Sequence, residues 1–160
     1  MLTVQLLCVG KLKERYWTDA CAEYEKRLGS FCKFQLVEVA EERLPDNPSA
    51  SQIAATVEAE GRRLLGKMPK DGKRIALCIE GQTVDSPALA AQMQRWAVEG
   101  ASRLVLIIGG SYGLSQAVKD AADWRLSMSP MTFPHQLARV MVLEQIYRAF
   151  QISGGGKYHK

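Results

Sequence analysis

The sequence has no apolar run long enough to cross a bilayer. A transmembrane helix needs about 20 consecutive apolar residues, and polar side chains interrupt every hydrophobic segment of this 160-residue chain well before that length. The N-terminal segment also lacks the basic start and small-residue cleavage site of a secretory signal peptide. We therefore expect a cytoplasmic protein that does not bind membranes.

Residues that bind metals are scarce. The four cysteines, at positions 8, 21, 32 and 78, form no C-x-x-C pair, and His135 and His159 are the only histidines. Zinc and thioredoxin-like sites need closely spaced sulfur or nitrogen ligands. We expect no metal, and reduced cysteines that pack as small apolar side chains.

The glycine fingerprint of dinucleotide-binding enzymes is also missing. That motif, G-x-G-x-x-G, follows the first strand of such a domain. Here the first predicted strand ends in a single glycine, Gly10, and is followed by "KLKER"; no Walker sequence occurs. This counts against a doubly wound nucleotide-binding enzyme, which remains one alternative.

The chain does contain alternating strand and helix patterns. Buried apolar runs such as "LVLII" are typical of central parallel strands, and helices of ten or more residues separate them. The pattern predicts a single α/β domain over residues 1–160, with helices on both faces of a parallel sheet. The expected strands are residues 3–10, 33–40, 74–81, 103–110 and 124–129, and the expected helices are 16–29, 51–68, 86–99, 115–123 and 133–155.

Two loops after predicted strands offer exposed backbone. Gly109, Gly110 and Gly113 follow the strand that ends "LVLII", and residues 127–136 form a loop stiffened by two prolines. We expect the strands before these loops to be neighbours. Their N–H and C=O groups beside apolar side chains would suit a flat, mostly neutral group such as adenine. Two purely structural turns are the alternative, because tight turns use glycine whatever they bind.

The last predicted helix is apolar on more than one side. Leu137, Val140, Leu143, Tyr147 and Phe150 form one stripe, and further apolar residues, among them Val142 and Ile146, cover much of the rest. A surface helix needs only one apolar face. The pattern indicates burial in a core or against a partner subunit, and we favour a homodimer.

Three segments together resemble the bacterial ribosomal RNA large-subunit methyltransferase H family, small enzymes of the SPOUT class. They are "IIGGSYGLS", "SMSPMTFPHQLARVMVLEQIYRAFQI" and the terminal "YHK". The likeness extends to "VGKLKERYWTDACAEYEKRLG", and so covers nearly the whole chain.

The resemblance implies a trefoil knot over approximately residues 74–153, followed by a tail over 154–160, although knots are very rare in proteins. It implies S-adenosylmethionine as cofactor, a homodimer, and methylation of N3 of a pseudouridine in 23S rRNA on assembled ribosomes. The cofactor residues implied by the match are Leu77, Gly109, Met128, Ser129, Pro130, Met131, Thr132 and Phe133.

The net charge of +4 gives only a faint signal for an RNA partner. The last 22 residues hold four basic residues and one acidic residue, and so carry most of the excess. A dedicated nucleic-acid module shows a stronger basic patch. A solvated basic tail is the alternative interpretation of this charge. Independently of the charge, a non-catalytic dimeric module that docks on the ribosome is the second alternative function.

Three residues are candidate catalytic groups. His135 is expected at the start of the last helix, where the helix dipole lowers a histidine pKa; a structural histidine is the alternative. Tyr158 and His159 follow a glycine hinge. Such a tail is usually frayed, whereas the resemblance implies that it closes over an active site, its own or the partner's. The identity of the catalytic base stays open.

Overall fold

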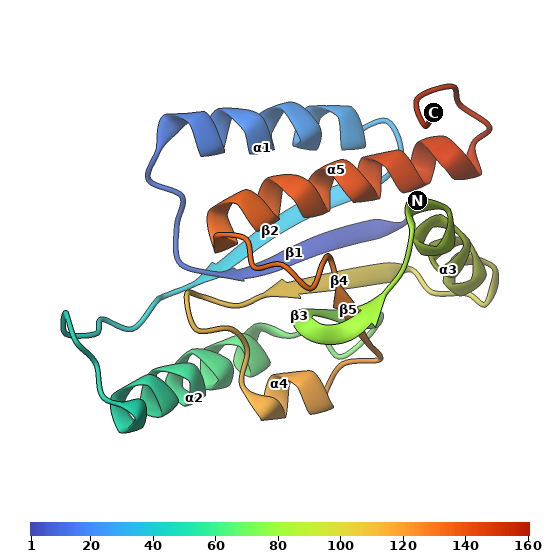
Figure 1. Cartoon of the computed structure of the whole chain (residues 1–160). Coiled ribbons are helices and arrows are strands. Elements are labelled where there is room, and N and C mark those ends of the chain that lie inside the picture. Colours follow the sequence, from blue (N-terminus) through green and yellow to red (C-terminus); the bar gives the residue numbers. More distant parts are fainter.

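Five parallel strands form one sheet in the computed structural model of residues 1–160 (Figure 1). They are β1 (Thr3–Val9), β2 (Lys33–Val39), β3 (Lys73–Thr83), β4 (Arg103–Ile108) and β5 (Trp124–Ser127). Their order across the sheet is β2-β1-β4-β3-β5. The predicted single-domain α/β fold is confirmed, and the loops after all five strands leave from the same edge of the sheet.

Helices cover both faces of the sheet, as predicted. One face carries α1 (Arg15–Leu28), α3 (Ser86–Val98) and α5 (His135–Ser153), and the other carries α2 (Ala50–Lys67) and α4 (Gln116–Asp120) (Figure 1). Side chains alternate along the strands: Leu6 and Leu106 belong to the core under α1, α3 and α5, whereas Leu7 and Ile107 belong to the core over α2 and α4. The central strands are apolar throughout because both of their faces are covered.

Local signals explain where three of the helices begin. Ser49 and Gln52 form a reciprocal capping box at α2. The side chain of Asp85 accepts a hydrogen bond from the Ala88 N–H at the start of α3, and Ser115 caps α4 in the same way. Most predicted boundaries lie within two residues of the observed ones. The helix predicted over 115–123 is shorter, because the chain leaves it after Asp120 to enter β5.

The strand order corrects one expectation. The Gly-rich turn follows β4 and the Pro-stiffened loop follows β5, but these strands are not neighbours, because β3 lies between them. β3 pairs irregularly with β5: Leu77 and Gln82 both align with Leu126, so residues 78–81 leave the ladder as a bulge. The bulge emerges between the two loops at the carboxyl edge of the sheet.

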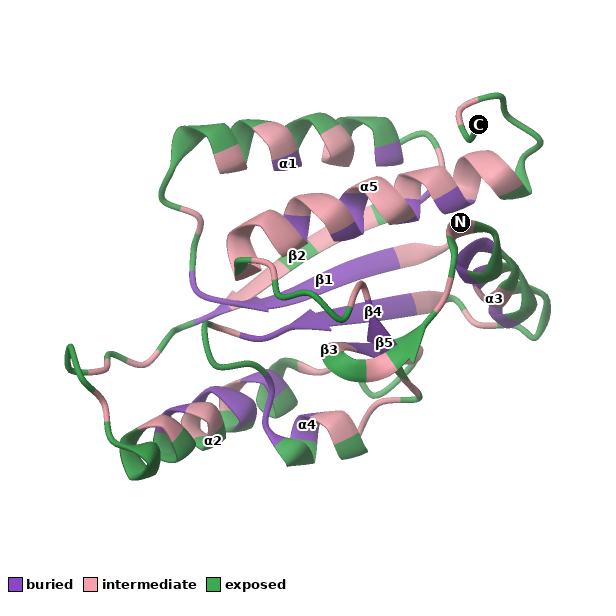
Figure 2. Ribbon diagram, viewed as in Figure 1, coloured by how far each residue is buried: buried purple, intermediate pink, exposed green.

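Helix α5 is enclosed along almost its whole length. It lies between α1 and α3 above the sheet, and no residue from His135 to Ile152 is exposed (Figures 1 and 2). Val142 and Ile146 are 2% and 1% exposed and belong to the core of the chain itself. Packing within one chain therefore explains why this helix is apolar on several sides, and its apolar character is no evidence for a homodimer. No helix, α5 included, is long and apolar enough to cross a membrane.

Candidate functional site

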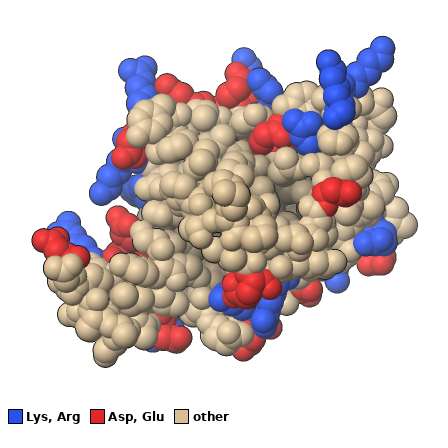
Figure 3. Space-filling view, in the orientation of Figure 1, with Lys and Arg blue, Asp and Glu red and all other residues tan.

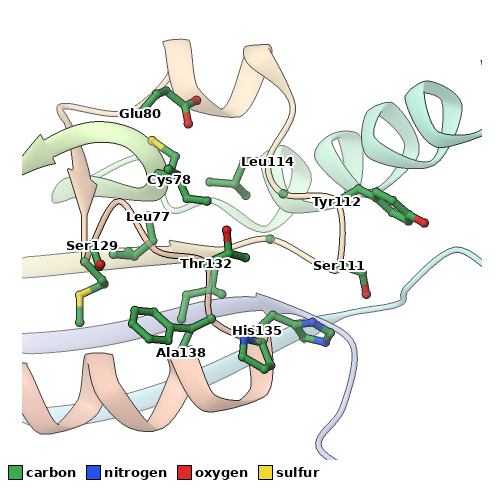
Figure 4. A pocket seen from close by; sticks show the side chains of 18 of the residues that line it. Leu77, Cys78, Glu80, Ser111, Tyr112, Leu114, Ser129, Thr132, His135 and Ala138 are labelled. Carbon is green, nitrogen blue, oxygen red and sulfur yellow. The ribbon is translucent and has the colours of Figure 1, made fainter. Parts of the chain in front are cut away.

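A cavity of about 830 Å³ opens at the carboxyl edge of the sheet. Three segments form most of its wall: the bulge of β3 with Leu77, the Gly-rich turn after β4, and the loop that leads from β5 into α5 (Figure 4). Pockets of about 300–1,000 Å³ with mostly apolar walls are typical of small-molecule sites. The structure thus brings together the two loops that the sequence singled out.

Most of the sequence-predicted cofactor residues line this cavity. Pro130 does not; it stiffens the loop whose neighbours do. The predicted residues in the wall are Leu77, Gly109, Met128, Ser129, Met131, Thr132 and Phe133. These residues are therefore placed where they could contact a bound ligand. Their individual contacts with a cofactor stay predictions.

The Gly-rich turn needs its glycines for its own closure. A Cβ atom on Gly109 would lie 2.5 Å from the carbonyl carbon of Gly113, a distance that real Cβ atoms do not adopt. Gly113 itself has a φ of +84°, in the region that favours glycine, and its N–H donates to the Gly110 carbonyl at 3.1 Å. The fold of the turn itself therefore requires glycine at position 109, whether or not a cofactor lies beside it.

Local hydrogen bonds shape the loop after β5. The buried Ser127 hydroxyl donates to the Ser129 carbonyl at 3.1 Å, and the Ser129 hydroxyl accepts from the Met131 N–H at 3.0 Å. Pro134 then begins α5 as its N-cap residue, with no side-chain cap. The first N–H groups of α5 thus have no intrahelical partner, and His135 and Gln136 line the cavity at this point.

His135 lies in the cavity wall and is half-buried. Burial is the main cause that lowers the pKa of its imidazole below the usual 6.5, and the positive charge of Arg139 lowers it further. The sequence predicted a lowered pKa for His135, but from the helix dipole; in the structure, burial and Arg139 lower it. His135 is therefore mostly neutral near pH 7 and able to accept a proton. In Figure 4 it lies across the cavity from Glu80, with Leu77, Leu114 and Thr132 between them.

Arg139 fixes the start of α5 against the sheet, a role that sequence reasoning missed. Its side chain is 2% exposed and forms an ion pair of 2.6 Å with Glu38 at the end of β2. It also donates to the backbone carbonyls of Val9, at 3.2 Å, and Gly10, at 2.7 Å. A buried charge needs such partners, so Arg139 holds the cavity wall formed by α5 in place.

The C-terminal tail does not reach this cavity within one chain. The Tyr158 hydroxyl donates to Glu144 Oε2 at 2.6 Å, and the Arg148 guanidinium lies over the Tyr158 ring, 4.6 Å from its centroid. His159 Nδ1 is 3.1 Å from Arg148 Nη1. The tail therefore packs on the C-terminal half of its own α5. His159 borders a separate, smaller hollow, which shares only Met128 with the main cavity.

Charged side chains are sparse around the middle of one face of the molecule. On the face seen in Figure 3, acidic and basic side chains lie mainly around the edge and both signs are mixed. This agrees with the modest net charge of +4. No broad basic surface for a polyanion is visible on that face.

Comparisons with known proteins agree with this geometry. The family model described as "Predicted SPOUT methyltransferase" matches residues 2–159. The fold is similar to that of a probable methylase family protein from Haemophilus influenzae Rd KW20, with a TM-score of 0.56 and 13% identity over 98% of this chain and 70% of the other. A Neisseria gonorrhoeae protein, also described as of a methylase family, gives a TM-score of 0.53 and 14% identity over 90% of this chain and 81% of the other.

Proposed function

The chain belongs to the SPOUT methyltransferase family, and from that premise we propose that it methylates N3 of a pseudouridine in 23S rRNA on assembled ribosomes, with S-adenosylmethionine as the methyl donor. The observation that carries this proposal is the cavity in which the Gly-rich turn and the 128–133 loop meet. The sequence segments that resemble the methyltransferase H family include those same two walls.

The cavity suits the proposed cofactor. Its volume of about 830 Å³ is large enough for an adenosyl group with an attached amino acid. Leu77, Met128 and Phe133 provide apolar surface for a flat ring. Ser129 and the backbone of the turn add polar groups beside it. S-adenosylmethionine supplies an electrophilic methyl group on sulfur, and this chemistry needs no metal.

The chain must provide a base for the target nucleotide. The N3–H of pseudouridine is an imide that stays mostly protonated at neutral pH, and a positioned base typically contributes about 10²- to 10⁴-fold to the rate. His135 is the candidate already in the cavity wall. Tyr158 and His159 could act only after the tail leaves its own α5, or in the cavity of a partner subunit.

Two further features are part of the proposal: a homodimer and a trefoil knot that threads the chain within residues 74–153.

Exposed apolar side chains around the cavity support the dimer: Ile79 is 51% exposed, Tyr112 48% and Met131 72%. We expect sedimentation analysis at micromolar concentration to give a dimer, and Met131→Glu to weaken it. Val98→Glu is the control, since Val98 is 77% exposed at the end of α3. A wild-type monomer contradicts the dimer.

One pair of measurements tests the activity. Calorimetric titration of the purified protein should show S-adenosylmethionine binding, which a mere docking module has no reason to show. Transfer of a radiolabelled methyl group should then be compared on isolated 23S rRNA, separate large subunits and whole ribosomes. We expect whole ribosomes to be the best substrate and the label to lie on a pseudouridine. Cofactor binding without transfer to any of the three would reject the proposed substrate but not the cofactor.

A further inference from the structure

One ion pair stands out in the cavity wall. Glu80, in the bulge of β3, pairs with Lys119 on α4, and both side chains line the cavity. They are the only acidic and basic residues among its lining residues apart from His135, which is mostly neutral near pH 7. The rest of the wall is apolar or uncharged, so any charged part of a ligand must meet this pair or remain in water.

The fold fixes both partners. Residues 78–81 leave the ladder between β3 and β5, which turns Glu80 out of the sheet beside Cys78 (Figure 4). Lys119 follows Val118, whose side chain is fully buried in the core over α4. The side chain of Lys119 is 18% exposed and that of Glu80 is 55% exposed. Lys119 is therefore an anchored cation, and Glu80 retains a face open to solvent or to a ligand.

We propose that Glu80 and Lys119 bind the zwitterionic amino-acid end of S-adenosylmethionine. This inference rests on the proposed function. The Glu80 carboxylate accepts hydrogen bonds from the α-ammonium group, and the Lys119 ammonium donates to the α-carboxylate. One ion pair then becomes an alternating group of four charges, and each of these four has a partner of opposite sign. A ligand end with two charges of the same sign would not gain both contacts.

The charge states suit this role. Lys119 hydrogen-bonds to Glu80 and lowers the pKa of that carboxyl below its usual 4.5. Glu80 is thus fully ionised at neutral pH. Hydrogen bonds to ionised groups are stronger than those between neutral groups, and they fix the direction in which a ligand enters. The amino-acid end at Glu80 leaves the adenosyl group among Leu77, Leu114 and Thr132, and places His135 on the far side of the cavity.

Three ligands separate this role from others. S-adenosylmethionine and S-adenosylhomocysteine both carry the amino-acid end, whereas 5′-methylthioadenosine lacks it. Only the first has a sulfonium charge. Calorimetric titrations should use wild type, Glu80→Gln and Lys119→Gln. The matched controls are Glu23→Gln and Arg27→Gln, which break an ion pair on α1 whose carboxylate side chain is 52% exposed.

We expect each cavity variant to lower affinity for S-adenosylmethionine and S-adenosylhomocysteine at least about tenfold, equivalent to about 1.4 kcal/mol. Affinity for 5′-methylthioadenosine should stay within about twofold, which also shows that the variants are folded. The control variants should bind all three ligands as wild type does.

Other outcomes overturn the inference in distinguishable ways. Equal losses for all three ligands would mean that the pair only shapes the cavity. A loss confined to S-adenosylmethionine would mean that Glu80 faces the sulfonium. Unchanged affinities in the variants would place the pair outside the ligand's reach while leaving the proposed function intact. A wild-type protein that binds none of the ligands would overturn both the proposed function and this inference.

Discussion

The Tyr158 hydroxyl donates a hydrogen bond of 2.6 Å to Glu144 Oε2, and this contact joins the C-terminal tail to the middle of α5. The tail begins with Gly154, Gly155 and Gly156, and without this contact little would hold it. The rings of Tyr158 and Tyr147 also form a T-shaped pair, with centroids 4.9 Å apart. The tail is thus an ordered element that can be released by breaking a small number of contacts.

We predict that Tyr158→Phe and Glu144→Gln release the tail without changing the fold. Hydrogen exchange in residues 154–160 should rise in both variants, with a thermal midpoint close to that of wild type. Tyr16→Phe is the matched control, since Tyr16 is 65% exposed on α1. Unchanged exchange in the tail would show that this hydrogen bond does not hold it.

The same contact predicts a pH limit. The Glu144 carboxylate accepts a hydrogen bond from the neutral Tyr158 hydroxyl, and this raises the pKa of Tyr158 from 10.0 to about 12. A raised pKa means that the contact is fully present below pH 10 and is lost as the pH rises through about 12. Ultraviolet titration of wild type against Tyr158→Phe should show one tyrosine that ionises last; a normal midpoint for Tyr158 would contradict the contact.

Deletion of residues 157–160 tests the tail in catalysis. Because the tail lies away from the cavity, we expect the truncated protein to keep its fold and its affinity for S-adenosylmethionine. Methylation of ribosomes should fall at least about tenfold, since base stacking on an aromatic side chain is worth about 1–3 kcal/mol. Unchanged single-turnover rates at saturating ribosome would exclude a chemical role for the tail.

Gly109→Ala should destabilise the protein as well as weaken cofactor binding. The new Cβ would meet the Gly113 backbone at 2.5 Å, so the turn must open, at a cost of about 1–3 kcal/mol. The control is Gly66→Ala in α2, where nothing lies within 4 Å of the added atom; it should be neutral or stabilising by up to about 1 kcal/mol. Urea denaturation measures both, and equal stability of the two variants would contradict the turn geometry.

Arg139→Met should be among the most harmful substitutions in α5. It leaves Glu38 without its partner and removes the donor to the carbonyls of Val9 and Gly10. Breaking a buried ion pair in this way costs about 3–5 kcal/mol. Arg15→Met, which breaks an exposed pair with Asp19 at 3.7 Å, should change stability by less than about 1 kcal/mol. Denaturant titration should separate the two clearly.

His135 should make the fold sensitive to mild acid. Its pKa is lowered in the folded state, so the unfolded chain binds the proton first as the pH falls below 6.5. Its contribution to stability is therefore fully present above pH 6.5 and is lost as the pH falls through the lower, folded value. The stability difference between wild type and His135→Gln should shift against wild type between pH 7 and pH 5. A constant difference would contradict the lowered pKa.

The sequence by itself determined which segments form strands and helices, and that helices cover both faces of the sheet. Strand and helix periods are local, so runs such as residues 103–108 could be interpreted without knowing what they contact. The family-specific segments also identified most of the cavity wall, because those residues are nearly contiguous in the chain. The prediction of S-adenosylmethionine as cofactor came from the family resemblance of these segments and not from their periodicity.

Only the tertiary structure decided which distant residues meet. Glu38 and Arg139 are 101 positions apart, and Glu80 and Lys119 are 39 apart. No periodic pattern records such pairs, because they depend on the order of the strands. The position of β3 between β4 and β5 could not be predicted, because the local pattern of a strand does not record its neighbours in the sheet. The position of the tail was likewise undetermined, since a glycine hinge permits many directions and only the contacts of Tyr158 and His159 with α5 select one.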